Sequence, residues 1–168
     1  MDKKKTTMSV PEMRRILGLR KTDSYWLVHK QCFETVMVKG KMRIVIDSFE
    51  HWYANQVKYK KVDGPPPGEE LRSYSYSPQE LAEELGVSDS IVYDLIKRYD
   101  IETFEVDYWM RIHKDVFAAW YKTQFRYRTK ADRDRDAELE AASMTMPEMA
   151  RLLLISRKEV YNLSLIHI

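Results

Sequence analysis

Cysteine, glycine and long apolar runs are scarce in this sequence. Its 168 residues include one cysteine, Cys32, and five glycines. A single thiol excludes an internal disulfide framework and fits a reducing cytoplasm. No stretch approaches the roughly 18 apolar residues of a membrane-spanning helix, and the charged segment MDKKKTTMSV has no apolar run behind it. We therefore expect a cytoplasmic protein with no membrane partner.

Patterns typical of catalysis and metal binding are missing as well. The sequence has no glycine-rich phosphate loop, no G-x-S-x-G elbow and no paired catalytic carboxylates. His29, His51 and His113 are scattered, without a second ligand at metal spacing. We predict that the protein is not an enzyme and that it binds no cofactor and no metal.

A short amphipathic segment, in contrast, occurs three times. VPEMRRILGL begins at Val10, PQELAEELGV at Pro78 and MPEMARLLLI at Met146, so consecutive copies lie 68 residues apart. Identities between the first two copies continue downstream, and they pair residues 43, 47, 49, 52, 53, 56 and 59 with the residues 68 positions later. A fixed period without gaps predicts a duplicated structural unit.

The second copy shows most clearly what the segment encodes. Ser77 and Glu80 have the spacing of a capping box, which starts a helix. Gly86 follows the last periodic residue and is expected to end that helix, and a second helix is predicted over residues 89–98. Two short helices joined by a turn that contains glycine form a helix-turn-helix, whose second helix can enter the major groove of DNA.

A hairpin and an aromatic helix are predicted to follow in the first copy. Residues 33–47 alternate around a Lys39-Gly40 turn, and residues 49–59 place Phe49, Trp52, Tyr53, Gln56 and Tyr59 along one helical face. An aromatic stripe at this spacing is typical of a small core, with base stacking as the alternative.

These motifs together carry a family resemblance. Ala82, Gly86 and Val92 have the spacing of the bacterial helix-turn-helix, and Arg43 and Arg111 end the two hairpins. Two complete units and the start of a third resemble the excisionase and MerR-like winged helix-turn-helix proteins of bacterial integrative and conjugative elements. The resemblance implies a mainly α fold with small β-hairpin wings (α+β), repeated in tandem. It also implies double-stranded DNA as the partner and a non-catalytic role as a transcription regulator or excisionase-like accessory factor.

The period divides the chain into six segments. Residues 8–61 and 76–128 are predicted as complete winged units, and residues 144–162 as a shortened helix-turn-helix. Residues 62–75 contain three consecutive prolines and are predicted to be an extended spacer, and residues 129–143 a charged helical linker that extends the preceding helix. Residues 163–168, LSLIHI, look like the translation of a sequencing adapter. We therefore expect a longer natural protein and exclude His167 from functional reasoning.

The charge is distributed unevenly over these segments. Residues 1–68 hold 14 Lys and Arg against seven Asp and Glu, whereas residues 69–136 hold 11 against 15. Because a polyanion attracts cationic surfaces and repels anionic ones, we expect the first unit to bind DNA. The second is then a spacer or a module that contacts a recombinase or another protein.

Candidate DNA-binding residues follow from aligning the copies. In the first unit they are Arg20, Lys21, Thr22, Trp26 and Lys30 on the second helix, and Lys39, Lys41 and Arg43 on the wing. The shortened third unit offers Arg157 and Lys158 as a second reader, whereas the middle unit offers Asp89 and Asp94, which would repel phosphates.

Two alternatives stay open for these residues. Lys39 and Lys41 could merely solubilise an exposed hairpin, while Arg43 could pair with Asp47 or cap the next helix. At the level of the whole protein, the winged units could form a protein-interaction scaffold instead of binding DNA.

The first copy departs from the other two at two positions. Ser24 stands where Val92 and Val160 are expected to pack the second helix, and Arg14 replaces a small alanine. We expect Tyr25, Leu27 and Val28 to anchor this helix instead.

Overall fold

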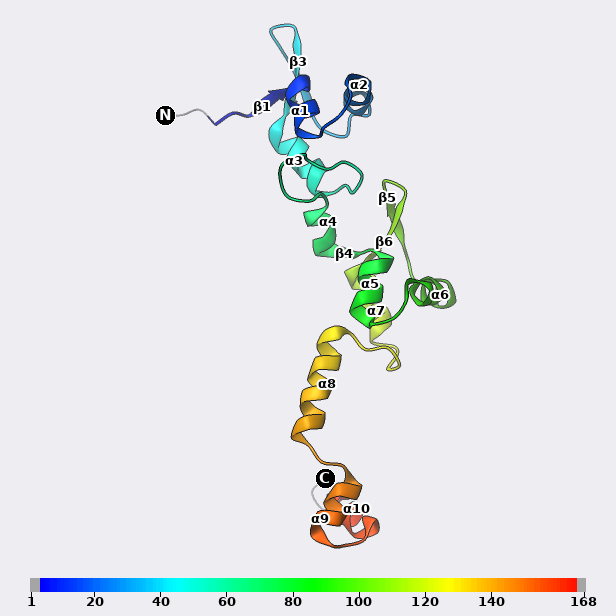
Figure 1. Ribbon diagram of the computed structural model, residues 1–168. Coiled ribbons are helices and arrows are strands. Elements are labelled where there is room, and N and C mark those ends of the chain that lie inside the picture. The colour runs from blue at the N-terminus through cyan, green and yellow to red at the C-terminus, as the bar shows by residue number, and fades with distance from the viewer. Residues whose placement is uncertain (1–3, 166–168) are drawn as a thin grey trace.

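The computed structural model describes residues 4–165, which form a mixed α+β structure. Figure 1 shows two bodies that each carry a small sheet, followed by a long helix and a final pair of helices. We call residues 7–61 the leading unit and residues 75–129 the middle unit.

The elements follow one another in the same order in both units. The leading unit contains β1 (Thr7–Ser9), α1 (Val10–Ile16), α2 (Lys21–His29), β2 (Thr35–Val38), β3 (Lys41–Val45) and α3 (Ile46–Ala54). After α4 (Glu69–Tyr74), the middle unit contains β4 (Ser75–Tyr76), α5 (Pro78–Leu85), α6 (Asp89–Tyr99), β5 (Phe104–Val106), β6 (Trp109–His113) and α7 (Lys114–Tyr121). The chain continues through α8 (Lys130–Ala142), α9 (Met146–Leu153) and α10 (Arg157–Leu165).

Each unit has an antiparallel sheet of three strands, in the orders β1-β3-β2 and β4-β6-β5. Met8 lies opposite Ile44, and Tyr76 lies opposite Ile112. Each pairing in the second sheet lies 68 positions after a pairing in the first. The hairpin around Lys39-Gly40 is confirmed, but the sequence did not reveal the short third strand that completes each sheet.

Each unit has its own hydrophobic core. The aromatic stripe packs inside, as predicted: Phe49 and Tyr53 are buried, and Trp52 and Tyr59 pack against them. The other members of the first core include Met8, Met13, Leu17, Leu27, Val28, Phe33 and Ile44. The second core contains Leu81, Ala82, Leu85, Val92, Leu95, Ile101, Ile112, Phe117 and Trp120. Tyr25 is an exception to the expected packing of α2, because it is exposed while Leu27 and Val28 are buried.

The turn between the paired helices has the same backbone conformation in all three places. Gly18 and Gly86 have φ values of +61° and +65°, and Leu154 has +55° at the matching place between α9 and α10. Left-handed backbone suits glycine, because a Cβ atom crowds the neighbouring carbonyl oxygen. The capping box at Ser77 and Glu80 and the helix end at Gly86 are confirmed.

The predicted helix over residues 49–59 is too long. The helix α3 ends at Ala54, and Gln56 then leaves the helical face to bind Tyr59. Gln56 Nε2 donates to the Tyr59 carbonyl oxygen at 2.6 Å, and the Tyr59 backbone N–H donates to Gln56 Oε1 at 2.7 Å. This closed loop stabilises a turn where a further helical turn was predicted.

The prediction of an extended spacer over residues 62–75 is wrong. Residues 69–74 form α4, and the prolines before it are held against α3. The Tyr53 hydroxyl donates to the Pro65 carbonyl oxygen at 2.9 Å and accepts from the Lys61 backbone N–H at 3.0 Å. Because Leu71 of α4 is fully buried, this segment packs between the units instead of reaching freely across a span.

The charged linker over residues 129–143 is helical, as predicted, but it does not extend α7. A loop of residues 122–129 separates α7 from α8, which starts with Thr129 as its N-cap. The Tyr121 hydroxyl fixes this loop, since it accepts from the Thr129 backbone N–H at 3.0 Å. The helix α10 runs on to Leu165, and residues 166–168, including His167, lie outside the described residues.

Candidate nucleic-acid interface

The exposed side of α2 carries the first group of predicted DNA-binding residues. This helix is anchored by Leu27 and Val28, which face the core, so its other side faces solvent. All five predicted residues on or next to it are exposed: Arg20, Lys21, Thr22, Trp26 and Lys30. Trp26 keeps 61% of its surface accessible, which is high for a large aromatic residue and leaves its indole free to contact a partner.

The wing carries the second group. Lys39 and Gly40 form a two-residue turn with φ values of +48° and +71°, and Val38 pairs with Lys41 across it. Positive φ at both central residues is typical of the tight hairpin turn that matches strand twist. Lys39 and Lys41 are both exposed. Lys41 and Arg43 lie on one side of β3 by strand alternation, whereas Lys39 lies in the turn itself.

Arg43 is placed differently from the two lysines. Its Nε donates to Thr7 Oγ1 at 2.9 Å, and its Nη2 donates to the Thr7 carbonyl oxygen at 3.1 Å. The side chain thus fastens β1 to β3, which is neither the ion pair with Asp47 nor the helix cap considered above. Because part of Arg43 stays accessible, its assignment as a DNA contact stays a prediction.

The equivalent of Arg43 in the middle unit is more deeply engaged. Arg111 donates to Ser75 Oγ at 2.8 Å and to the Ser75 carbonyl oxygen at 3.1 Å. It also forms an ion pair with Glu80 at 2.9 Å, and only 4% of its surface is accessible. Charge-assisted hydrogen bonds satisfy a buried guanidinium, so Arg111 is a structural arginine.

Two cations of the leading unit are replaced by carboxylates in the middle unit. Asp89 stands in place of Lys21 at the start of α6, and Asp107 stands in place of Lys39 in the wing turn. Asp107 Oδ2 accepts a hydrogen bond from the Val57 backbone N–H at 3.1 Å. The middle wing therefore reaches the leading unit and uses its tip for contact within the chain.

The second predicted reader lies at the start of α10. Arg157 and Lys158 begin this helix, and both are exposed. Glu148 and Glu159 accept backbone hydrogen bonds from Thr145 and Ser156, and these bonds lower the pKa of each carboxyl. The structure does not bring Arg157 and Lys158 together with the cations of the leading unit, because the middle unit and α8 lie between them (Figure 1).

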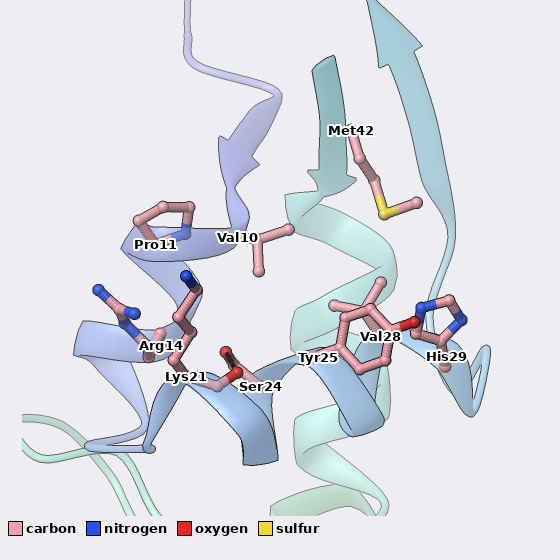
Figure 2. A pocket seen from close by; sticks show the side chains of 9 residues that line it. All are labelled: Val10, Pro11, Arg14, Lys21, Ser24, Tyr25, Val28, His29 and Met42. Atoms are coloured by element: carbon pink, nitrogen blue, oxygen red, sulfur yellow. Dashed lines mark hydrogen bonds between the residues drawn. The ribbon is translucent and has the colours of Figure 1, made fainter.

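A pocket lies between α1, α2 and β3 of the leading unit, and we call it the α1–α2 pocket. Figure 2 shows that Lys21 and Tyr25 line this pocket from α2 and that Met42 lines it from β3. The exposed helix and the wing strand are therefore neighbours that border one cavity. The alignment of the copies gave no direct sign of this pocket, although Ser24 and Arg14, which line it, are the two departures noted above.

The pKa of the carboxyl group that caps α1, that of Glu12, lies well below its ordinary value. The pKa of Glu12 falls from its ordinary value of 4.5 to about 2, first because Lys5 donates a hydrogen bond to it and then because the Ser9 backbone N–H donates another. Glu12 is thus an anion that belongs to the helix start, and Lys5 is not free to bind a partner through that contact.

Neither a metal centre nor a membrane span is found in the part of the chain that the structure describes. No three His, Cys, Asp or Glu side chains gather there as a metal would require. Among the helices of residues 4–165, none combines the length and the apolarity needed to cross a bilayer. Cys32 is exposed. The Nδ1 atom of His51 lies 3.2 Å from Glu70 Oε2, but no third ligand completes a cluster with this pair among the described residues.

Comparison of the chain with protein-family models, curated proteins and solved structures finds no significant match.

Proposed function

We propose that the chain carries winged helix-turn-helix units in tandem and binds double-stranded DNA as a non-catalytic accessory or regulatory protein. The leading unit reads the duplex, Arg157 and Lys158 give a second contact, and the middle unit spaces the two. The observation that carries this proposal is that α2 and the wing, which hold the exposed cations, border one pocket on the leading unit.

The proposed contacts differ in what they supply. Lys21, Lys39 and Lys41 bind phosphates and provide affinity that does not depend on sequence. Arg20 and Thr22 lie at the start of α2, the part of a recognition helix that meets base edges. Trp26 adds an apolar contact to a thymine methyl group or to the sugar.

A salt titration of the full chain tests the proposal. Binding to a pool of mixed duplexes is measured by fluorescence anisotropy for the wild type and for the double variant Lys21→Glu, Lys39→Glu. We expect affinity at low salt to fall on the order of 100-fold, because two phosphate contacts become repulsive. The slope of log affinity against log salt should become less negative by about 2, since each lost contact releases roughly 0.9 fewer counterions.

A matched variant controls for net charge. Lys122 and Lys130 are also exposed, but they lie at the end of α7 and the start of α8. The double variant Lys122→Glu, Lys130→Glu makes the same change in charge and should retain wild-type affinity within about threefold, because these lysines lie outside the proposed contact surface. Equal losses in the two double variants would refute the assigned surface.

One observation favours a second function, that of a protein-interaction scaffold. The middle unit exposes large aromatic side chains: Tyr108 is 93% accessible, and Trp109 and Phe125 are largely accessible as well. Aromatic residues in such positions are typical of protein interfaces. Capture of a protein by the wild-type chain that persists at high salt, combined with no DNA affinity in dilute buffer, would favour this function.

A further inference from the structure

The α1–α2 pocket has the size and lining of a small-molecule site. Its volume is about 320 Å³, at the lower end of the range for ligand pockets. Most of its wall is carbon, contributed by Val10, Pro11, Val28 and Met42. Burying an apolar group there would remove it from water, which favours binding in proportion to the area covered.

Ser24 explains why there is room at this place. It is buried between α1 and α2, where the other two copies bury the larger Val92 and Val160. The Ser24 hydroxyl donates to the Lys21 carbonyl oxygen at 2.8 Å, so its hydrogen-bonding capacity is used within the helix. Serine at this position thus leaves an uncharged, compact floor below the pocket.

Two cations lie on one side of the pocket. In Figure 2 the ends of Arg14 and Lys21 are seen on the α1 side of the pocket, and Met42 and His29 are seen on the other side. Neither Arg14 nor Lys21 forms an ion pair within residues 4–165. The matching residues of the middle unit are Ala82 and Asp89, so the middle unit has no cation at either of these two positions.

We propose that the α1–α2 pocket binds a small organic anion that has a compact apolar body and one carboxylate. The apolar body contacts Val10, Val28 and Met42, and the carboxylate accepts hydrogen bonds from Arg14 and Lys21. Bonds between charged groups are shorter and stronger than neutral ones, so the two cations select an anion over its neutral analogue. This proposal does not depend on DNA binding, although an occupant would compete with phosphate for Lys21.

The test uses 2-naphthoate as the probe and the full chain labelled with ¹³C at the methionine methyl groups. The chain has nine methionines, and Met42 lies in the wall of the pocket. The Met42 methyl signal is assigned from the variant Met42→Leu and followed by NMR during titration. We expect a saturable shift of this signal with a dissociation constant of roughly 0.1 to 1 mM, which is reasonable for a ligand of this size.

The neutral analogue 2-naphthamide separates charge recognition from apolar burial. We expect it to bind at least fivefold more weakly than 2-naphthoate. The variant Arg14→Gln should weaken 2-naphthoate several-fold and 2-naphthamide little. Its control, Arg98→Gln, removes an exposed cation from α6 and should change neither.

The variant Ser24→Val fills the floor with the residue found in the middle unit and should weaken both probes at least tenfold. If the methyl spectrum shows that this variant does not fold, two other comparisons still test the proposal. These are the affinities of the wild type for the two probes, and the affinities of Arg14→Gln for the same probes. An unshifted Met42 signal at several millimolar 2-naphthoate, or equal affinity for the acid and the amide, would overturn the proposal.

Discussion

The leading and middle units share two sets of internal hydrogen bonds and carry opposite charges at two matched positions. Arg43 fastens β1 to β3, and Arg111 fastens β4 to β6. Gln56 closes the turn after α3, and Gln124 closes the turn after α7. At the start of the second helix and in the wing turn, in contrast, Lys21 and Lys39 are replaced by Asp89 and Asp107. Buried contacts tolerate little change, because a lost partner costs more than a surface substitution. The proposed difference in function between the two units therefore rests on these replaced positions and not on the internal bonds.

The largest expected effect tests the internal bonds. Arg111→Ala should lower the local stability of the second sheet by about 3 kcal/mol, since it removes two hydrogen bonds to Ser75 and the ion-paired bond to the partly exposed Glu80. Arg43→Ala should cost the first sheet only about 1 kcal/mol, because Arg43 is partly exposed and has fewer partners. Native-state hydrogen exchange measures both sheets in the same chain. Each variant should leave the other sheet unchanged, and equal losses would show that the two arginines are equally structural.

The wing turns give an effect of about 1 kcal/mol in opposite directions. Gly40 has φ of +71°, and the space that a Cβ atom would occupy there is open, so Gly40→Ala should destabilise the first hairpin by conformational strain alone. Tyr108 has φ of +70° and is almost fully accessible, so Tyr108→Gly should stabilise the second hairpin by up to about 1 kcal/mol. The exchange rates of the β3 and β6 amides measure these changes. A loss of stability in Tyr108→Gly would mean that the tyrosine side chain packs against something.

The sequence predicted those parts of the fold that depend on local signals. The capping box at Ser77, the turn at Gly86 and the hairpin at Lys39-Gly40 each follow from a few neighbouring residues, and all three are found. The strands β1 and β4 are too short to show an alternating pattern, and α4 follows a run of prolines that favours extended chain. These elements depend on contacts between distant parts of the sequence, which a local pattern does not reveal. Arg43 holds β1 in place, and Tyr53 holds the segment before α4.

The candidate site was predictable in a similar, partial way. Charge and alignment placed nine of the ten predicted residues at positions that are exposed, Arg43 being partly covered. The pocket between α2 and the wing was not predictable, because its walls come from three elements that only tertiary packing brings together. Ser24 was visible as a departure from valine, but a sequence gives no measure of the space that such a change leaves.

A single charge reversal in the middle unit sharpens the comparison further. Asp89→Lys introduces at the start of α6 the cation that Lys21 provides on α2. We expect DNA affinity to rise about threefold and the salt slope to steepen by roughly 0.9, if the new lysine reaches a phosphate. The gain is modest, because a cation in the first turn of a helix opposes the helix dipole. An unchanged slope would show that α6 does not face the duplex even when its charge permits contact.

The smallest effect concerns the acid that caps each first helix. Glu12 is held by Lys5 in the leading unit, whereas Glu80 is held by the buried Arg111 in the middle unit. The pKa of Glu12 is lowered to about 2, so its stabilising contribution is complete above its ordinary value of 4.5 and is lost as the pH falls towards 2. A ¹³C NMR titration of the glutamate carboxyl groups measures this directly. Lys5→Gln removes the largest cause and should raise the pKa of Glu12 towards 4.5, while the Ser9 backbone bond keeps it somewhat below. If Glu12 of the wild type already titrates near 4.5, Lys5 does not hold it in solution, and the exposed lysine is free to add to the cationic surface of the leading unit.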